Sequence, residues 1–359
     1  MLLAMIILAQ TQKIIYRRLW NARLSYSMAF SAMTVFEGEQ IIITEKLANN
    51  KRLPLPWVLV NYKIPSVFTY VNIMNQKIKF GEYRELLYVV GAKKAISKKY
   101  NVVCGKRGVY QLTNFALSSN NPLMTDFRHM ELGFHYTLTV YPKLVDYDEF
   151  ELFYKKMSGD LLAKRFINPD PFTFKGIREY QPYDNFRQIN FMATAKTGEL
   201  MSNIYDFTVS QEITILLNLQ EYNQYYKRDF VHEEAIRLAA FLCRKYAGGG
   251  IQVNLVCPSP EGEPYQTGGV SSDAHLDRIY TALARINLDS DISSVMQYMP
   301  KSEGQAGILI SSYHGQDLVE KLNEIKERSD IIWIIPKCGH DTVTVSGEDI
   351  VVWEACKNA

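Results

Sequence analysis

Charged and aromatic side chains alternate most densely in residues 175–200, KGIREYQPYDNFRQINFMATAKTGEL. Its charged side chains include Arg178, Arg187, Lys196, Glu179, Asp184 and Glu199. Arginine presents a planar fork that pairs two carboxylate oxygens, so Arg178 or Arg187 against Asp184 is expected to fix the loop at 181–185. Such pairs hold a domain junction together more often than they bind a partner, and both interpretations stay open. No histidine lies between His135 and His232, so histidine offers no proton shuttle here.

A second chemical possibility is the run IIPKCGHDTV at residues 334–343, which contains Cys338, His340 and Asp341. It follows a predicted strand, where α/β proteins place chemistry, and a thiolate–imidazole pair can act as a nucleophile. A cysteine and a histidine two positions apart on a loop rarely point at each other, however, and no third partner is identifiable. We therefore expect no catalytic residue here.

Other candidate groups have structural interpretations. His232, His275 and His314 are expected to be surface or helix-cap residues. Gly248 to Gly250 follow a predicted helix and precede a strand, which is the reverse of the order that a dinucleotide-binding loop needs. The sequence therefore predicts a protein that is not an enzyme and has no cofactor.

Composition places the chain among ordinary globular proteins, with 47% hydrophobic and 22% charged residues over 359 positions. A net charge of +2 gives no concentrated basic field, so nucleic acid is not an expected partner. The five cysteines are widely spaced and contain no C-x-x-C pair. We expect reduced thiols that pack as small core residues, without a zinc site or a disulfide framework.

The first residues, MLLAMIILAQ, are apolar and are followed by Lys13, Arg17, Arg18 and Arg23. Basic residues flank the cytoplasmic ends of membrane spans, and about ten apolar residues are half of what a span needs. Residues 1–24 therefore predict a membrane-proximal segment, with the soluble part of the protein in the cytoplasm. The pattern is also that of a span that begins upstream of residue 1; a buried or amphipathic helix is the alternative.

The rest of the chain shows two periodicities. In residues 25–145, short aromatic and β-branched runs with a period of two predict an antiparallel β-sandwich. Residues 146–211 are expected to hold a linker helix and the charged stretch. In residues 212–359, apolar strands alternate with helices, which predicts a doubly wound parallel sheet.

The order of these motifs resembles the bacterial domain of unknown function 58 family over nearly the whole chain. The positions that carry the resemblance are Gly176, Arg178, Tyr180, Pro182, Asp184, Arg187, Ile189, Asn190, Ala193, Ala195 and Leu200. The chain departs from the family at Tyr183, where glycine is usual, at Phe191 in place of tryptophan and at Lys196 in place of arginine. We expect Gly176, Arg178, Tyr180, Pro182, Asp184, Arg187 and Asn190 to form a signature or docking motif.

The resemblance also implies that the C-terminal half is similar to a von Willebrand factor A domain. Such domains often bind a metal through an Asp-x-Ser-x-Ser run, a threonine and a further aspartate. The corresponding positions here are Asn218, Gln220, Tyr222, Thr267 and Ser312. None of these side chains is a carboxylate, and a dication among neutral ligands is poorly compensated for its lost water. We therefore expect a degenerate site without a metal.

Members of the resembling family are often encoded near MoxR-type AAA+ ATPases and transglutaminase-like membrane proteins. The resemblance thus implies a membrane-associated scaffold or adaptor that binds protein partners, with a MoxR-type ATPase as the candidate partner. The alternative is a metal-dependent (MIDAS-type) adhesion module. A hydrolase or transferase that uses Cys338 and His340 is the least favoured function.

Overall fold

The computed structural model describes residues 2–71, 77–79, 83–144, 174–181, 186–205, 212–221, 228–269, 272–288, 295, 298, 306–326, 329–339, 341–347 and 349–355. The chain divides into two compact units. Unit 1 comprises Met1–Leu144 with Tyr280–Asn287, and unit 2 comprises Val145–Ile279 with Leu288–Ala359.

Unit 1 contains two sheets of mainly antiparallel strands. One sheet has the order β1-β3-β8-β5-β6, formed by Leu24–Phe30, Gln40–Asn49, Lys94–Cys104, Phe68–Val71 and Lys77–Lys79. The other has the order β2-β11-β9-β4-β7, formed by Thr34–Phe36, Tyr136–Tyr141, Gly108–Ser119, Leu55–Lys63 and Tyr83–Val90, and β10 (Arg128–Leu132) also pairs with β9. Only β11 and β2 run parallel among these described pairs. Side chains from both sheets form one hydrophobic core.

A polar cluster lies inside that core. Glu45 is fully buried and accepts hydrogen bonds from the Tyr62 and Tyr88 hydroxyls, each at 2.8 Å. Arg84 has its Nε 3.9 Å from Glu45 Oε1 and its guanidinium 3.7 Å from the centre of the Tyr70 ring. Hydrogen bonds and an opposite charge thus compensate the burial of this carboxylate.

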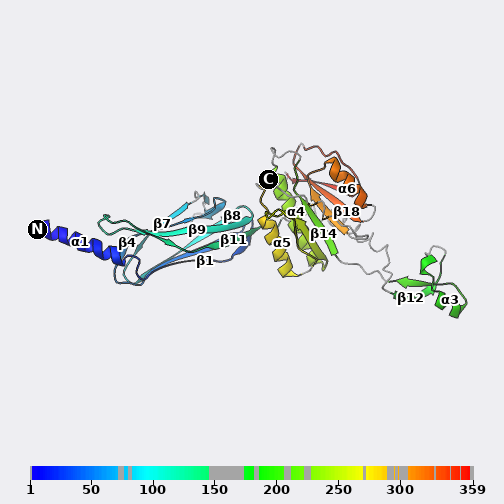
Figure 1. Cartoon of the computed structure of the whole chain (residues 1–359), viewed down its shortest axis with the longest axis horizontal. Helices are drawn as coiled ribbons and strands as arrows, with labels where there is room; N and C mark the ends of the chain where they lie inside the picture. Colours follow the sequence, from blue (N-terminus) through cyan, green and yellow to red (C-terminus); the bar gives the residue numbers. More distant parts are fainter. Residues whose placement is uncertain are drawn as a thin grey trace. The chain divides into compact units, whose positions relative to one another are not determined.

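Helix α1 (Leu2–Leu19) is anchored to unit 1 at its C-terminal end. Tyr16 and the following Trp20 are buried in the core, and the Tyr16 hydroxyl donates to the Pro54 carbonyl at 2.8 Å. Figure 1 shows the rest of α1 extending away from the sheets, and most of its large apolar side chains are exposed. Among the described helices, none has the length and apolar character needed to cross a membrane.

The short segment Tyr280–Asn287 completes unit 1. The buried Arg107 donates through Nη1 to the carbonyls of Leu283 and Ile286, at 2.9 and 2.8 Å. These carbonyls are at the C-terminal end of a helix, where a cation is favourable.

Unit 2 contains a sheet with the order β16-β15-β14-β17-β18-β19. Its described strands are Tyr265–Gln266, Gln252–Cys257, Glu212–Asn218, Ala306–Ser311, Asp330–Lys337 and Ile350–Glu354, and among these only β16 is antiparallel to its neighbour. The longer described helices of this unit are α4 (Asp229–Gly248), α5 (Asp273–Arg285, which continues into unit 1) and α6 (Gln316–Lys326) (Figure 1). Strands β14, β15 and β17 are buried along nearly their whole length, as expected for a parallel sheet covered on both faces.

Unit 2 also contains the charged stretch. Here β12 (Phe174–Glu179) pairs antiparallel with β13 (Met201–Tyr205), and the short helices η1 (Phe186–Gln188) and α3 (Phe191–Thr197) lie between them in sequence. Asn190 caps α3, since its side-chain oxygen accepts the Ala193 N–H at 2.8 Å.

These observations confirm the predicted fold class in its coarse form: antiparallel sheets come first, and a mainly parallel sheet with helices follows. The sequence did not predict strands at β1, β2, β5, β6, β10, β12, β13 or β16. The linker helix expected at residues 146–163 lies outside the described residues.

Candidate functional site

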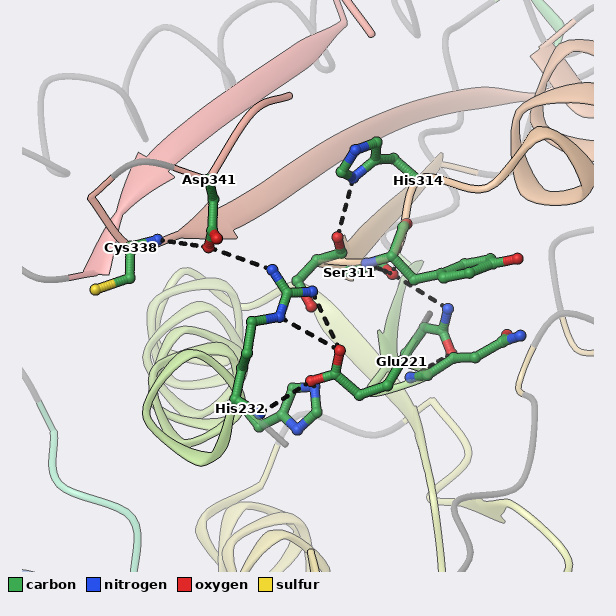
Figure 2. A network of polar contacts seen from close by, with 11 residues as sticks. Glu221, His232, Ser311, His314, Cys338 and Asp341 are labelled. Carbon is green, nitrogen blue, oxygen red and sulfur yellow. Dashed lines mark hydrogen bonds and ion pairs between the residues drawn. The ribbon is translucent and has the colours of Figure 1, made fainter. Parts of the chain in front are cut away.

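Strands β14, β17 and β18 run parallel, so their carboxyl ends meet at one edge of the sheet. Ligands of open α/β sheets bind at this edge, where the strand order reverses. The reversal lies between β14 and β17, because β15 lies on one side of β14 and β17 on the other. Figure 2 shows the polar side chains that gather here.

Hydrogen bonds join the strand ends directly. Asn218, the last residue of β14, donates from Nδ2 to Ser311 Oγ at the end of β17, over 3.1 Å. The same hydroxyl donates to the Tyr313 carbonyl and accepts the Tyr313 N–H, both at 3.1 Å. The buried Trp333 of β18 donates from Nε1 to the Ser311 carbonyl at 3.1 Å. Hydrogen bonds to Ser311 therefore connect the ends of β14 and β17 with β18.

A charged network lies beside these bonds and is centred on Arg228, the residue before α4. Its Nε and Nη2 donate to Glu221 Oε2 at 3.3 and 3.2 Å, and its Nη1 donates to Asp341 Oδ2 at 3.2 Å. The Arg228 N–H also donates to Glu221 Oε1 at 3.2 Å, and His232 Nε2 lies 3.1 Å from that oxygen. Arg228 thus connects the segment after β14, the start of α4 and the turn after β18. Glu221, His232 and Asp341 of this network are labelled in Figure 2.

This environment determines the charge of Glu221. Burial by itself raises the pKa of the Glu221 carboxyl, whereas the hydrogen bond and charge of His232 and the guanidinium of Arg228 lower it. The net effect is a pKa below the usual value. Glu221 is therefore an ionised carboxylate at neutral pH that is already paired with cationic and hydrogen-bonding neighbours.

The predicted metal-site positions are only partly brought together. Asn218 lies in the site, where it binds Ser311. The side-chain oxygens Gln220 Oε1 and Ser312 Oγ are buried and have no hydrogen-bond partner among the described residues. Thr267 instead accepts the Leu255 N–H at 2.8 Å and thereby supports strand β15. Tyr222 lies outside the described residues.

Metal-ligating side chains do not converge on a coordination site in the described part of the chain. No cluster of three His, Cys, Asp or Glu side chains that could hold a metal ion occurs there. The carboxylates of Glu221 and Asp341 are shared with one guanidinium, and the remaining donors are the neutral oxygens of Asn218, Gln220 and Ser312. This donor set fits hydrogen-bonding chemistry better than coordination of a dication.

The thiol chemistry considered for Cys338 is not supported. Cys338 is disulfide-bonded, so the expectation of a reduced thiol is wrong at this position and the sulfur is not a free nucleophile. The Asp341 carboxylate accepts the Cys338 N–H at 3.1 Å and binds Arg228. His340 lies outside the described residues. Cys104, Cys243 and Cys257 are buried and are not disulfide-bonded, as expected.

Two histidines differ from the expectation of surface or cap positions. His232 is buried on α4 against Glu221, and His275 is buried with Nε2 2.9 Å from the Val253 carbonyl. Each buried imidazole thus lies beside an acceptor oxygen, from the Glu221 carboxylate and the Val253 carbonyl respectively. His314 is half-buried, with Nδ1 3.1 Å from the Ser312 carbonyl.

The signature positions lie in the β12–β13 segment, away in sequence from the sheet edge. Gly176 and Arg178 are in β12, and Arg178 donates to the Glu179 carbonyl at 3.0 Å. Tyr180 and Phe186 have ring centres 5.9 Å apart. Pro182 and Asp184 lie outside the described residues, as does the side chain of Arg187, so the predicted Arg–Asp184 pair stays a prediction.

Sequence reasoning missed Glu221 and Arg228. Both were detectable in principle, because Glu221 follows a buried strand by three positions and Arg228 immediately precedes the next helix. Those two places face the same sheet edge in any parallel α/β fold.

Residues 176–337 match the family described as "Protein of unknown function DUF58", which supports the resemblance for this part of the chain. No curated protein matches the chain. Among solved structures, a CARDB domain from Pyrococcus furiosus in complex with di-metal ions is similar at 11% identity. The match covers 33% of this chain and 91% of that chain, with a TM-score of 0.21. The C-terminal domain of wzt has 12% identity, 35% and 77% coverage and a TM-score of 0.22. AvmM, described as catalysing macrocyclization in alchivemycin A biosynthesis, has 9% identity, 35% and 94% coverage and a TM-score of 0.23.

Proposed function

We propose, from the DUF58 match over residues 176–337, that this chain is a non-enzymatic, membrane-associated scaffold that binds a protein partner through its β12–β13 segment. The observation that carries this proposal is the exposure of large apolar side chains on that segment. Phe186 and Phe191 are each 76% exposed and Met192 is 75% exposed.

The exposure of so many large apolar side chains is unusual for a segment of this size. An isolated two-stranded hairpin is at best marginally stable in water and needs further packing. Helix α3 has no buried residue, and Ile177 and Leu200 of the same segment are also exposed. Aromatic and methionine side chains are enriched in protein interfaces. A partner that covers them would remove apolar surface from water and stabilise the hairpin.

The folds of the two units are consistent with a binding role. Numbered from β14, the sheet of unit 2 has the order 3-2-1-4-5-6 with an antiparallel third strand, which fits the proposed von Willebrand factor A-like fold. The two sheets around one core in unit 1 fit a β-sandwich. At the sheet edge of unit 2, Arg228 supplies a positive charge between two carboxylates, which supports docking without a metal.

Membrane association is proposed through residues 1–24. The exposed apolar side chains of α1 are distributed along the helix, and Arg17 and Arg18 lie in its last turn. An apolar helix followed by basic residues suits a bilayer with anionic headgroups. The soluble part of the protein is then on the cytoplasmic side.

The partner proposed from the family resemblance is a MoxR-type AAA+ ATPase. The test is a binding titration of the purified full chain with the MoxR-type ATPase of the same organism, by biolayer interferometry. Phe186→Ala, Phe191→Ala and Met192→Ala together should weaken binding at least about tenfold, since apolar anchors dominate interface energies. The matched control, Lys196→Ala with Glu199→Ala, changes exposed polar residues of the same segment and should bind like the parent.

Equal binding by the apolar variant and the control would show that the β12–β13 segment is not the docking surface. An ATPase that does not bind the parent chain would refute that partner. The substitutions themselves should leave the fold intact, because exposed side chains contribute little to stability.

The second candidate function is the metal-dependent (MIDAS-type) adhesion module. The observation in its favour is the pair of buried, unpartnered oxygens Gln220 Oε1 and Ser312 Oγ in the described part of the sheet edge. Calorimetric titration of the full chain with Mg²⁺ or Mn²⁺ distinguishes the two functions. Saturable heat with a rise in thermal stability would favour adhesion, because a ligand of the native state stabilises it.

A further inference from the structure

The turn between β9 and β10 in unit 1 presents apolar side chains to solvent. Leu123 is 53% exposed, Met124 70% and Phe127 59%. Polar residues and glycine are usual in such turns, and water is an unfavourable environment for large apolar groups. Contiguous exposed apolar residues of this kind mark an interaction surface.

The turn is held in a defined conformation by its own polar residues. Asn121 is buried, and its Oδ1 accepts the Thr125 N–H at 2.7 Å while its Nδ2 donates to Thr125 Oγ1 at 2.9 Å. Asp126 is fixed by a two-point pair with Arg128, at 3.0 and 3.1 Å. Met124 adopts a φ of +52°, which is unfavourable for a side chain of this type. The hydrogen bonds therefore preform a turn whose tip is Leu123 and Met124.

Contacts within unit 1 place this turn at the same end of the sheets as α1. The Phe127 ring packs against Trp57 with ring centres 6.3 Å apart, and Trp57 is near the start of β4. Pro54, which immediately precedes β4, accepts the hydrogen bond from Tyr16 of α1. From the segment after α1, Asn21 Nδ2 lies 3.6 Å from Met130 Sδ of β10. The tip and the base of α1 therefore belong to one end of unit 1.

That end of unit 1 is strongly basic. Segments 17–23, 50–54 and 91–94 contain seven Lys or Arg residues and no Asp or Glu. They are joined there by the Asn50 N–H donating to the Arg23 carbonyl at 3.0 Å and the Lys93 N–H donating to the Lys51 carbonyl at 2.9 Å. The exposed members are Arg17, Arg18, Arg23, Arg52, Lys93 and Lys94. The acidic residue of the turn, Asp126, is already paired with Arg128.

Lys51 is the buried member of this group. Its Nζ has no hydrogen-bond partner among the described residues, and burial lowers the pKa of its ammonium to about 8. The ammonium is still mostly protonated at neutral pH, so it adds positive potential to this end of the unit. A nearby anionic surface would reduce the cost of its unpaired charge.

We propose that this end of unit 1 is a membrane-docking surface, in which Leu123 and Met124 insert into the interface of a bilayer containing anionic lipids while the surrounding basic residues contact the headgroups. The occupant is a bilayer because the exposed apolar helix α1 starts from the same end and because the charge is complementary to anionic lipid. The inference rests on the proposed membrane association and adds a second contact to it. Insertion of the preformed tip fixes which end of unit 1 faces the lipid.

The test is co-sedimentation of the purified full chain with phosphatidylcholine vesicles, with and without phosphatidylserine. Leu123→Ser with Met124→Asn removes the apolar tip, and asparagine suits the positive φ at position 124. We expect at least about a tenfold loss of vesicle affinity, because two large side chains no longer leave water. The matched control is Val109→Ser, which removes an exposed apolar side chain near the opposite end of β9.

A second measurement follows the tip itself. In the Leu123→Trp variant, the added tryptophan fluorescence should shift to the blue and be quenched by brominated lipid when vesicles containing phosphatidylserine are added. The Leu123→Phe variant supplies the background signal of the native tryptophans.

The outcomes separate the two proposals. The tip contact is overturned if the parent and the tip variant bind vesicles equally well and the tryptophan fluorescence at position 123 shows no blue shift. In that case α1 alone attaches the protein to the bilayer. A parent chain that does not bind either vesicle refutes membrane association and the tip contact together. Equal affinity for vesicles with and without phosphatidylserine refutes the role of the basic residues, and tip-dependent self-association without vesicle binding identifies a second copy as the occupant instead.

Discussion

Replacement of Arg228 by methionine removes the guanidinium on which the charged network of unit 2 depends. The variant keeps a long side chain but leaves Glu221 and Asp341 without their shared cation. Glu221 retains only His232 as a charged or hydrogen-bonding side-chain partner from this network. The segment after β14 and the turn after β18 also lose their connection through the start of α4.

The expected loss of stability follows from the exposure of the three side chains. Breaking a fully buried ion pair costs about 3–5 kcal/mol, and breaking an exposed pair costs about 0–1 kcal/mol. Arg228 is 20% exposed, Glu221 12% and Asp341 32%, so the pair with Glu221 lies between the buried and the exposed case, and the pair with Asp341 is close to the exposed one. We expect about 2–3 kcal/mol in total, mostly from the unpaired carboxylate of Glu221.

The loss should depend on pH in a defined direction. The pKa of Glu221 is lowered in the folded protein, so its ion pairing stabilises the fold above the unfolded pKa of about 4.3 and is lost as pH falls through the folded pKa. The difference between the parent and Arg228→Met should therefore be full at pH 7 and decrease as the pH falls below about 4.3.

Hydrogen exchange measured by mass spectrometry suits this test, because peptides from β14, β17 and β18 report on unit 2 separately from unit 1. Arg244→Met is the matched control, since Arg244 is an exposed arginine of α4 and should change stability by less than about 0.5 kcal/mol. The reasoning is refuted if Arg228→Met costs no more than this control, or if its cost is the same at acidic and neutral pH.

Three further predictions concern other parts of the chain. Asn190→Ala removes the cap of α3 and should destabilise that helix by about 1 kcal/mol, seen as faster exchange of its amides, whereas Asn190→Ser should largely keep the protection. Burial, with Glu45 nearby, raises the pKa of Tyr62 and Tyr88 well above the usual value. Their neutral forms therefore stabilise unit 1 below about pH 10, and this stability is lost as the pH rises. Tyrosinate absorbance at those positions should appear only together with unfolding, and ionisation before unfolding would contradict this. Burial raises the pKa of Cys104 to about 12 and also raises that of Cys243, so both should react with a thiol reagent at pH 8 only after denaturant is added.

Strand and helix positions were predictable where one pattern dominated. The sequence contains an apolar run at 212–219 and a helical period at 229–246, and these residues form β14 and α4 within a few residues. The hairpin of β12 and β13 was not predicted, because charges and aromatic residues are mixed there without a clear alternation. Its strands are defined by pairing with each other, for example Arg178 with Ser202, and such pairing leaves little trace in one sequence.

The buried carboxylate of Glu45 shows both the strength and the limit of pattern reasoning. In β3 the inward positions include Ile41, Ile43 and Leu47, and strict alternation places Glu45 on the same face. Hydropathy alone would place it outside. The alternation thus predicts that Glu45 is buried, but its compensation by Tyr62 and Arg84 depends on which strands pack across the core, and that is set by the tertiary structure.

The same distinction applies to the sheet edge of unit 2. Its location follows from the parallel strands, but the identity of the cation there does not follow from the positions of Asn218 and Gln220. A dication would have to compete with Arg228 for Glu221 Oε2 and Asp341 Oδ2, the two oxygens that the guanidinium already binds. Displacing the guanidinium would leave it unpaired and mostly buried, and that cost adds to the dehydration of the metal. A metal-dependent function therefore requires Arg228 to leave the network, whereas docking through exposed apolar side chains leaves the network intact.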